Sequence, residues 1–159
     1  MNYRIKSPET EMKAVVQLPS SKSICNRALI LNVLSYSPYP IQNLSDCDDT
    51  AVLVKALNSN DRDFDIQAAG TAMRFLTAFL AKVALGARIE YMEKEGFPPL
   101  RIWGSALQGG EISLSGGVSS QYISALLMVA PLMEKGLVLH LEGNIISKPY
   151  IQLTLQLMK

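Results

Sequence analysis

The sequence predicts an α/β fold in which short strands alternate with amphipathic helices. Two observations lead to this prediction. Five apolar segments with helical spacing each follow small or hydroxyl-bearing residues, and four short runs with partial apolar alternation are bounded by Gly or Pro. Their alternation in a loosely repeated order is typical of α/β architecture, although no segment is repeated residue for residue. The chain is long enough for one core, or for one lobe of a larger protein.

The expected helices occupy residues 19–34, 43–57, 68–84, 116–132 and 145–158. Hydroxyl and acidic residues at their starts are favourable, because a side-chain oxygen there accepts hydrogen bonds from unpaired backbone N–H groups. Apolar residues then recur at intervals of three and four, which indicates the face that packs on the core. The faces expected to be buried are Ile24, Ala28 and Leu31; Met73, Leu76, Leu80 and Val83; and Ile123, Leu126, Leu127 and Ala130.

The expected strands occupy residues 87–93, 99–104, 110–116 and 136–143. Each has partial apolar alternation over a length typical of strands. The glycine pairs 109–110 and 116–117 indicate turns or points of close backbone approach. His140 lies inside the last apolar run and is interpreted as a strand residue rather than as a general base.

Charge and composition exclude several classes of protein. A net charge of +1 at pH 7 gives no reason to expect binding to nucleic acid or to an anionic membrane surface. The longest apolar run, residues 125–133, is too short to cross a bilayer, and the N-terminal residues lack the apolar core of a signal peptide. Cys25 and Cys47 are too few for a disulfide framework, and a single histidine cannot build a metal cluster. We expect a soluble, cytoplasmic protein with reduced thiols and no metal.

The stretch PSSKSICNRAL at residues 19–29 is the first candidate binding site. Lys22 lies in the first turn of the expected helix, where a cation opposes the positive end of the helix dipole. Ser23 and Arg27 are four residues apart and share one helix face. Unpaired N–H groups, a hydroxyl and two cations at one helix start form a site for phosphate or carboxylate. The alternative is a solvated first turn with Arg27 in a surface salt bridge. A Walker P-loop is excluded, because no glycine stands five positions before Lys22.

Three further helix starts combine glycine, hydroxyl and amide groups in a similar way. An ordinary capped helix is the alternative at each of them. Because equivalent helix ends of an α/β repeat tend to face the same side, the four starts together can line one cleft. The residues are Gly70 and Thr71, with Thr71 as the candidate cap; Ser119, Ser120 and Gln121; and Ser147, Pro149 and Tyr150, with Ser147 as the candidate cap.

The acidic segment at residues 46–49 is interpreted structurally. Asp46, Asp48 and Asp49 favour a helix N-terminus through the helix dipole and need no ligand there. A metal site is the alternative, but the spacing of the carboxylates does not support it.

Five strings of residues together resemble EPSP synthase, a family of enolpyruvyl transferases. They are LPSSKSICNRALIL, NLSDCDDT, AAGTAMRFLTAFL, GGVSSQYISALLMVAPL and ISKPYIQLTLQLM, and they occur in the order found in that family. The related transferase that acts on UDP-N-acetylglucosamine resembles the same fold, but its first motif has Lys-Asn where this chain has Lys22-Ser23.

The resemblance implies transfer of the enolpyruvyl group of phosphoenolpyruvate to the 5-hydroxyl of shikimate 3-phosphate in the shikimate pathway, with release of phosphate. In that family the alkene is protonated, the hydroxyl adds, and a tetrahedral ketal loses phosphate; no organic cofactor or essential metal is implied. Lys22 is the one matched residue suited to proton transfer. The matched positions for shikimate 3-phosphate are Lys22, Ser23, Arg27, Ser119, Ser120, Ser147 and Tyr150; those for phosphoenolpyruvate are Lys22, Gly70 and Gln121.

The chain departs from the family pattern in several ways. Family members have two lobes, each with three copies of a βαβαββ unit. By the resemblance, residues 1–20 are a short stretch of the first lobe, and residues 21–159 are an incomplete second lobe. The second half of the enzyme, with its acid and base carboxylates, is expected as a missing partner. A strand, a loop with a phosphoenolpyruvate-binding arginine and a helix are also missing after Val83, and Ala68 stands where many relatives have Asn.

These departures predict that the polypeptide alone does not turn over. Two other functions remain as alternatives. A non-catalytic module would bind a phosphorylated small molecule without chemistry that depends on phosphoenolpyruvate, and the UDP-N-acetylglucosamine transferase would prefer the UDP-sugar.

Overall fold

The computed structural model describes residues 3–4, 6, 11, 13–60, 63–83, 87–95, 98–104 and 106–159. The predicted mixture of helices and strands is confirmed. The elements along the chain are α1 (Lys22–Leu34), α2 (Asp48–Asn58), α3 (Gly70–Val83), β1 (Ala87–Tyr91), β2 (Leu100–Gly104), β3 (Gly110–Ser115), α4 (Ser120–Val129), the 3-10 helix η1 (Ala130–Leu132), β4 (Leu137–Glu142) and α5 (Lys148–Leu157). Each of the five helices and four strands falls within or close to the range predicted for it.

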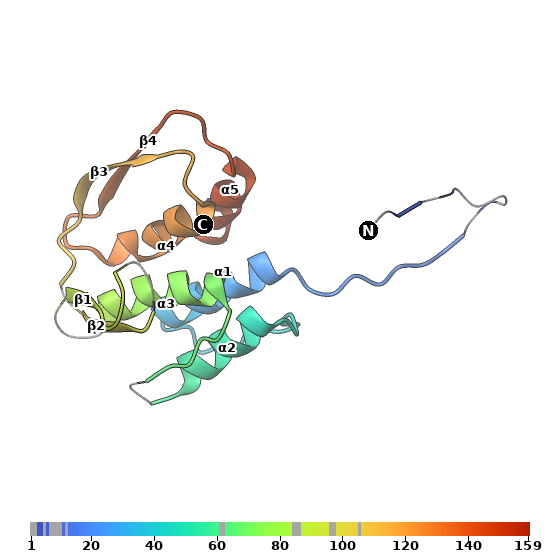
Figure 1. Ribbon diagram of the computed structural model, residues 1–159, viewed down its shortest axis with the longest axis horizontal. Helices are drawn as coiled ribbons and strands as arrows, with labels where there is room; N and C mark the ends of the chain where they lie inside the picture. Colours follow the sequence, from blue (N-terminus) through green and yellow to red (C-terminus); the bar gives the residue numbers. More distant parts are fainter. Residues whose placement is uncertain are drawn as a thin grey trace.

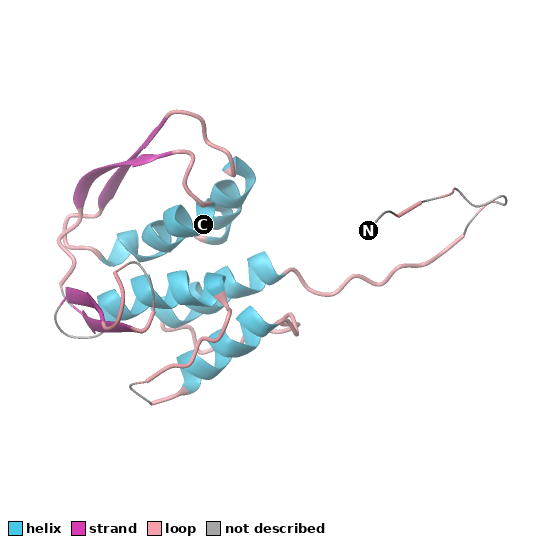
Figure 2. Ribbon diagram, viewed as in Figure 1, coloured by secondary structure: helices cyan, strands magenta, loops and turns pink. Residues whose placement is uncertain are grey.

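The strands form two separate pairs at the periphery of the helices (Figure 2). Strands β1 and β2 are antiparallel, with Ala87 opposite Gly104. Strands β3 and β4 are parallel, with Gly110 opposite Leu137, and α4 lies in the connection between them. The order β3–α4–β4–α5 is a βαβα run and corresponds to part of the expected βαβαββ unit.

The core lies between the first four helices. Leu53 of α2, Phe75 of α3 and Ile30 of α1 are almost completely buried, and Met128 and Val129 of α4 close the cluster. Burial of apolar area on this scale is the main source of stability for a domain of this size.

The faces that the helices bury differ in part from those predicted. On α1, Ile24 is 43% exposed, and Asn26 and Arg27 are buried instead. On α3, Leu76 is buried as predicted, but the buried face also includes Phe75 and Phe79, and Val83 at the end of the predicted face is 47% exposed. Asn26 accepts a hydrogen bond from Thr50, and Arg27 donates hydrogen bonds to Ser124 and Thr154. These buried partners allow α1 to turn its polar residues Asn26 and Arg27 toward the interior.

The buried face of α4 also passes through serines. Ile123 is buried as predicted, whereas Leu126, Leu127 and Ala130 are only partly buried, because Ser120 and Ser124 occupy the interior positions of that face.

Residues 13–21, which precede α1, do not pack on the helices (Figure 1). Residues 13–21 contain no helix or strand and extend away from the body (Figure 1). Val15 and Leu18 are 95% and 83% exposed. The folded body therefore begins at α1.

Candidate functional site

The starts of α1, α2, α3 and α4 gather at one end of the structure. In Figure 1 these four helices all begin on the right-hand side of the body and run toward the left. Hydrogen bonds join neighbouring starts, as the following paragraphs describe. Three of the four starts that were predicted to face one side, those of α1, α3 and α4, do so, and the start of α2 joins them (Figure 1). The cleft that the four predicted starts would line stays a prediction. We call this end of the molecule the helix-start cluster, comprising residues 21–23, 47–50, 69–72 and 119–121.

The start of α1 keeps free backbone donors. Ser21 is the N-cap residue, but its hydroxyl makes no capping bond. The N–H groups of Ile24 and Cys25 donate to the Ser21 carbonyl. Among the described residues, the N–H groups of Lys22 and Ser23 are therefore the unpaired donors that a helix start leaves.

The Lys22 ammonium is paired with Asp49 of α2. Its Nζ donates to Asp49 Oδ2 over 2.9 Å. This hydrogen bond raises the pKa of Lys22 above its ordinary value of 10.5, although burial acts in the opposite direction. Nearly half of the Lys22 side chain is exposed, so the ammonium remains open to a ligand.

Asp49 also caps a second helix. Its Oδ1 accepts hydrogen bonds from the backbone N–H groups of Thr71 and Ala72, at 2.9 and 3.2 Å. The prediction that Thr71 caps α3 is therefore wrong: helix α3 is capped by a carboxylate from α2. Burial raises the pKa of Asp49, but the bonds from Lys22, Ala72 and Thr71 outweigh it and hold the pKa below 3.8. The expected dipole role of the acidic segment extends in this way to a neighbouring helix.

Gln121 of α4 is bridged to the start of α3. Its Nε2 donates to Thr71 Oγ1 over 3.1 Å, and its Oε1 accepts from Arg74 Nη1 over 2.9 Å. The same Arg74 nitrogen donates to the Gly70 carbonyl over 2.8 Å. A Cβ added at Gly70 would lie 2.8 Å from this nitrogen, so a side chain there would displace the guanidinium. The predicted residues Gly70 and Gln121 are brought together through Arg74.

The two serines at the start of α4 differ in their surroundings. Ser119 is exposed and its Oγ accepts from Gln121 N over 3.4 Å, so it is the cap. Ser120 is only 6% exposed. One serine is used in capping, and the second lies inside.

Arg27 lies inside the protein. The alternative to an anion site, in which Arg27 forms a surface salt bridge, is therefore wrong. The residue is 2% exposed. Its Nε donates to Thr154 Oγ1 over 2.7 Å, its Nη2 to Ser124 Oγ over 2.9 Å, and its Nη1 to the Ser23 carbonyl over 2.9 Å. In the part of the chain that the structure describes, no carboxylate pairs with it.

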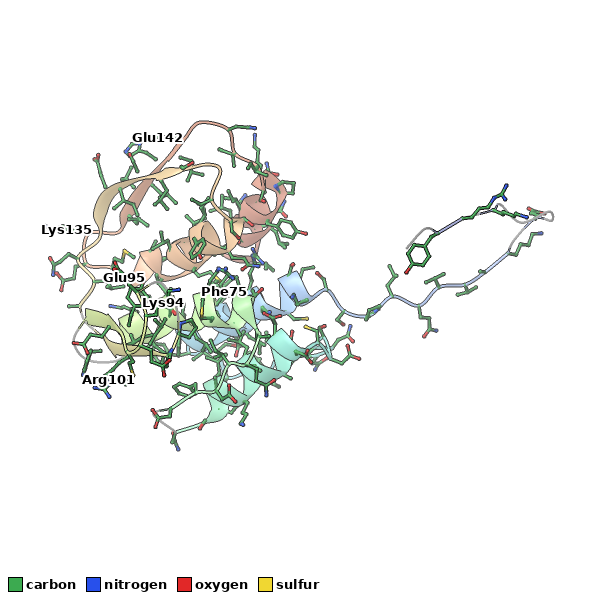
Figure 3. All side chains as sticks on the ribbon, viewed as in Figure 1. Phe75, Lys94, Glu95, Arg101, Lys135 and Glu142 are labelled. Carbon is green, nitrogen blue, oxygen red and sulfur yellow. The ribbon has the colours of Figure 1, made fainter. Side chains whose placement is uncertain are left out.

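Aromatic rings complete the surroundings of Arg27. The guanidinium carbon lies 5.4 Å from the centre of the Phe75 ring and 5.9 Å from that of Tyr150, within the range of cation–π attraction. Figure 3 labels Phe75 on α3, on the side toward α4. Burial lowers the pKa of Arg27 from its ordinary value, but an arginine stays charged at neutral pH.

The start of α5 also lies beside the Arg27 guanidinium. Pro149 occupies the first turn, as predicted. Ser147 is the N-cap residue but its side chain makes no capping bond, so its predicted capping role is wrong. Tyr150 is about half exposed and places its ring beside Arg27.

Several important residues were not predicted from the sequence. Arg74, Ser124 and Thr154 lie at interior helix positions, where a polar residue on an otherwise apolar face is the only local signal. Asp49 was predicted to stabilise only the start of its own helix, α2. Its hydrogen bond to Thr71 of α3 joins residues that are 22 positions apart in the sequence. A search for polar residues that interrupt a buried face would have found Ser124 and Thr154.

The arrangement is suited to binding an anion. Aligned helix starts place partial positive charge and free N–H groups at one end. Lys22 adds a positive charge at the surface, which its ion pair with Asp49 partly offsets, and Arg27 carries a second positive charge in the interior. Among the described residues, no group of three His, Cys, Asp or Glu is placed to hold a metal ion. In the same part of the chain, each helix falls short of the length and apolar character needed to cross a bilayer.

Comparisons with known proteins agree with this chemistry. The family model for "EPSP synthase (3-phosphoshikimate 1-carboxyvinyltransferase)" matches residues 6–59 and 83–159. A 3-phosphoshikimate 1-carboxyvinyltransferase of Bacteroides fragilis (strain YCH46) is 52% identical over 184 aligned positions, which cover 100% of this chain and 45% of the relative. Proteins with the same name from Vibrio atlanticus and Mannheimia succiniciproducens are 34% and 33% identical, and each alignment covers 96% of this chain and 48% of the relative.

The chain therefore spans about half the length of these relatives. The alignment with the Bacteroides protein has 184 positions and the chain has 159 residues, all of them aligned. The difference leaves 25 positions of the relative without a counterpart here.

Proposed function

Because the chain belongs to the EPSP synthase family, we propose that it contributes the shikimate 3-phosphate half-site of an enolpyruvyl transferase. In the proposed reaction the 5-hydroxyl of shikimate 3-phosphate adds to phosphoenolpyruvate, and the resulting ketal loses phosphate. The observation that supports this most directly is the helix-start cluster, where the Lys22 ammonium and free backbone N–H groups lie at the start of α1, the helix that also carries the buried Arg27. Both substrates are anions, so each would be attracted to this end of the molecule.

We propose that the residues around Arg27 hold the sugar phosphate. Lys22 and Ser23 would donate from the start of α1, and Ser119 and Ser120 from α4. Each terminal nitrogen of Arg27 has a second N–H beyond the bond described above, and these would be the donors toward the substrate. From α5, the proposed ligands are Ser147 and Tyr150.

Phosphoenolpyruvate would lie beside the bridge between α3 and α4. Gly70 and Gln121 would border this position. Lys22 would reach it from α1, because its partner Asp49 also bonds to the start of α3. The absence of a side chain at Gly70 would let a carboxylate or phosphate approach the backbone. Arg74 adds positive charge directly behind Gln121, which favours an anion there.

For Lys22 we propose a role in binding charge rather than in moving a proton. The bond to Asp49 raises the pKa of Lys22 and makes its ammonium a weaker acid at neutral pH. Proton transfer by Lys22 would require that the bond to Asp49 be released first.

We further propose that residues 1–20 belong to the other lobe of the complete enzyme, and that this lobe is the partner of residues 21–159. The exposed apolar side chains of Val15, Val16 and Leu18 are available for such packing. The 159-residue chain alone would bind substrate without turnover, because 25 aligned positions and about half of the relatives' length have no counterpart in it. A binding module for a phosphorylated small molecule is thus the second candidate function.

Calorimetric titration with shikimate 3-phosphate tests the proposal. We expect saturable binding that weakens at least tenfold in Lys22→Met, a variant of similar length without the charge. Lys55→Met, in the last turn of α2, is the matched control and should bind as the wild type does. No binding by a chain shown to be folded would contradict the proposed half-site, and tighter binding of UDP-N-acetylglucosamine would reassign it.

A phosphate-release assay with both substrates tests the second part of the proposal. We expect no turnover by the 159-residue chain. A rate close to that of a full-length relative under the same conditions would refute the assignment of a binding half-site without catalysis.

A further inference from the structure

The buried surroundings of Arg27 are unusual for a charged group. Burying a cation is costly, and proteins usually offset that cost with a carboxylate. Here Arg27 is 2% exposed, and the hydrogen-bond partners of its guanidinium are two hydroxyls and one carbonyl. These partners orient the group without cancelling its charge.

The hydrogen bonds fix where each hydroxyl proton points. Thr154 donates its only hydroxyl proton to the Tyr150 carbonyl, over 2.9 Å. It must therefore accept in its 2.8 Å bond with Ser124, which makes Ser124 the donor of that pair. Both oxygens then present lone pairs to Arg27: Thr154 Oγ1 to its Nε–H and Ser124 Oγ to an Nη2–H.

This relay joins three helices at fully buried positions. Ser124 of α4 and Thr154 of α5 are both 0% exposed, so water does not compete for their bonds to Arg27 of α1. Bonds between a charged donor and a buried neutral acceptor are strong and directional. The planar guanidinium is held at two adjacent edges, which leaves little freedom of rotation.

We propose that Ser124 and Thr154 are positioning residues that hold the Arg27 guanidinium in place and leave its positive charge available to a substrate anion. The proposal rests on the proposed function for the identity of that anion. A carboxylate at either position would hold the arginine equally well but would neutralise it. Two neutral hydroxyls leave the charge of Arg27 free to attract a ligand. An arginine with only a structural role could equally well be paired with a carboxylate.

The test compares three variants of the full chain. Thr154→Val removes the hydroxyl and keeps the shape, and Thr154→Ser keeps the hydroxyl. Thr77→Val is the matched control, because among the described residues the Thr77 hydroxyl bonds to the Met73 carbonyl of its own helix and to no other group. By calorimetry we expect Thr154→Val to weaken shikimate 3-phosphate binding about tenfold, while Thr154→Ser and Thr77→Val stay within about twofold of the wild type.

A second readout does not need the ligand. The Nε–H proton of Arg27 is observable by 1H–15N NMR and is assigned by its loss in Arg27→Lys. We expect it to exchange slowly with water in the wild type and in Thr154→Ser, and at least tenfold faster in Thr154→Val. If the wild type does not bind shikimate 3-phosphate, the proposed function fails, and this exchange rate alone decides whether Thr154 positions Arg27.

Ser124→Asp separates position from charge. We expect this variant to keep the Nε–H protected and to lose at least tenfold in affinity for shikimate 3-phosphate, because the new carboxylate neutralises Arg27. Unchanged affinity in folded Ser124→Asp, or unchanged affinity and exchange in folded Thr154→Val, would overturn the proposal.

Discussion

Asp49 joins three helix starts, and its replacement should destabilise the whole helix-start cluster. The carboxylate accepts two backbone N–H groups of α3 and pairs with Lys22 of α1. Asp49→Ala removes a cap, which costs about 1 kcal/mol. It also breaks an ion pair, and because almost half of the Lys22 side chain is exposed that pair contributes only about 0.5 kcal/mol. With the backbone donors left partly buried, we expect a total loss of about 2 kcal/mol.

Thermal unfolding followed by circular dichroism at pH 7 measures this loss. A change of about 2 kcal/mol should lower Tm by roughly 4–8 °C in a domain of this size. Asp48→Ala is the matched control, since Asp48 is the exposed neighbouring carboxylate in the same first turn. Equal Tm values for the two variants would refute the assignment of Asp49 as the cap of α3.

The pH dependence of this effect has a defined sign. The pKa of Asp49 is lowered in the folded state, so its contribution is complete above its unfolded value of about 3.8 and is lost as the pH falls through the lower folded value. The pKa of Lys22 is raised, so its contribution is complete below 10.5 and is lost as the pH rises beyond that value. The Tm difference between Asp49→Ala and wild type should be constant from about pH 5 to 9 and shrink below pH 4.

Three further predictions follow from other parts of the structure. Phe75→Ala should reduce the free energy of unfolding in urea by about 3–5 kcal/mol, because the ring is fully buried; a loss below 1 kcal/mol would contradict its place in the core. Iodoacetamide should label Cys47 before Cys25, because Cys25 is buried. Burial raises the pKa of Cys47, but its hydrogen bonds and the nearby Lys22 lower that pKa overall. Peptide mass mapping measures the two labelling rates, and equal rates would contradict this prediction. Gln121→Ala should lower the free energy of unfolding by about 2 kcal/mol, because the hydrogen bonds of Gln121 to Thr71 and Arg74 are lost. Gln152 is exposed, so Gln152→Ala is the control and should cause almost no change. Equal midpoints of urea unfolding for the two variants would contradict the bridge between α3 and α4.

The position of the helices and strands could be predicted because their signals are local. Turn residues, glycines and apolar periodicity lie within each segment, and the five α-helices and four strands of the described residues lie in or close to the ranges that these signals predict, although the predicted caps Thr71 and Ser147 were wrong. The common direction of the helices could also be predicted, because an alternating α/β order tends to place the N-terminal ends of the helices on the same side.

The buried faces and the bonding partners could not be predicted, because they depend on contacts between distant parts of the chain. Arg27 and Thr154 are 127 positions apart, and nothing near either residue specifies the other. Apolar spacing placed Ile24 in the core of α1, whereas the hydrogen bonds available to Asn26 and Arg27 turn the opposite side inward. Similarly, the cap of α3 comes from another helix, so no inspection of residues 68–72 alone could have identified it.

The common orientation of α1 to α4 (Figure 1) has an energetic consequence for the molecule without ligand. Each helix start carries the equivalent of about half a positive charge, so four adjacent starts bring about two positive charges together and repel one another. Asp49 relieves part of this repulsion from within the chain. A bound dianion would relieve the rest, so the fold and its ligand are thermodynamically linked: occupancy stabilises the packing of the helices, and weaker packing lowers affinity for the anion. The resting molecule therefore holds an electrostatic strain at one end, and an anion bound there, as proposed, would release it.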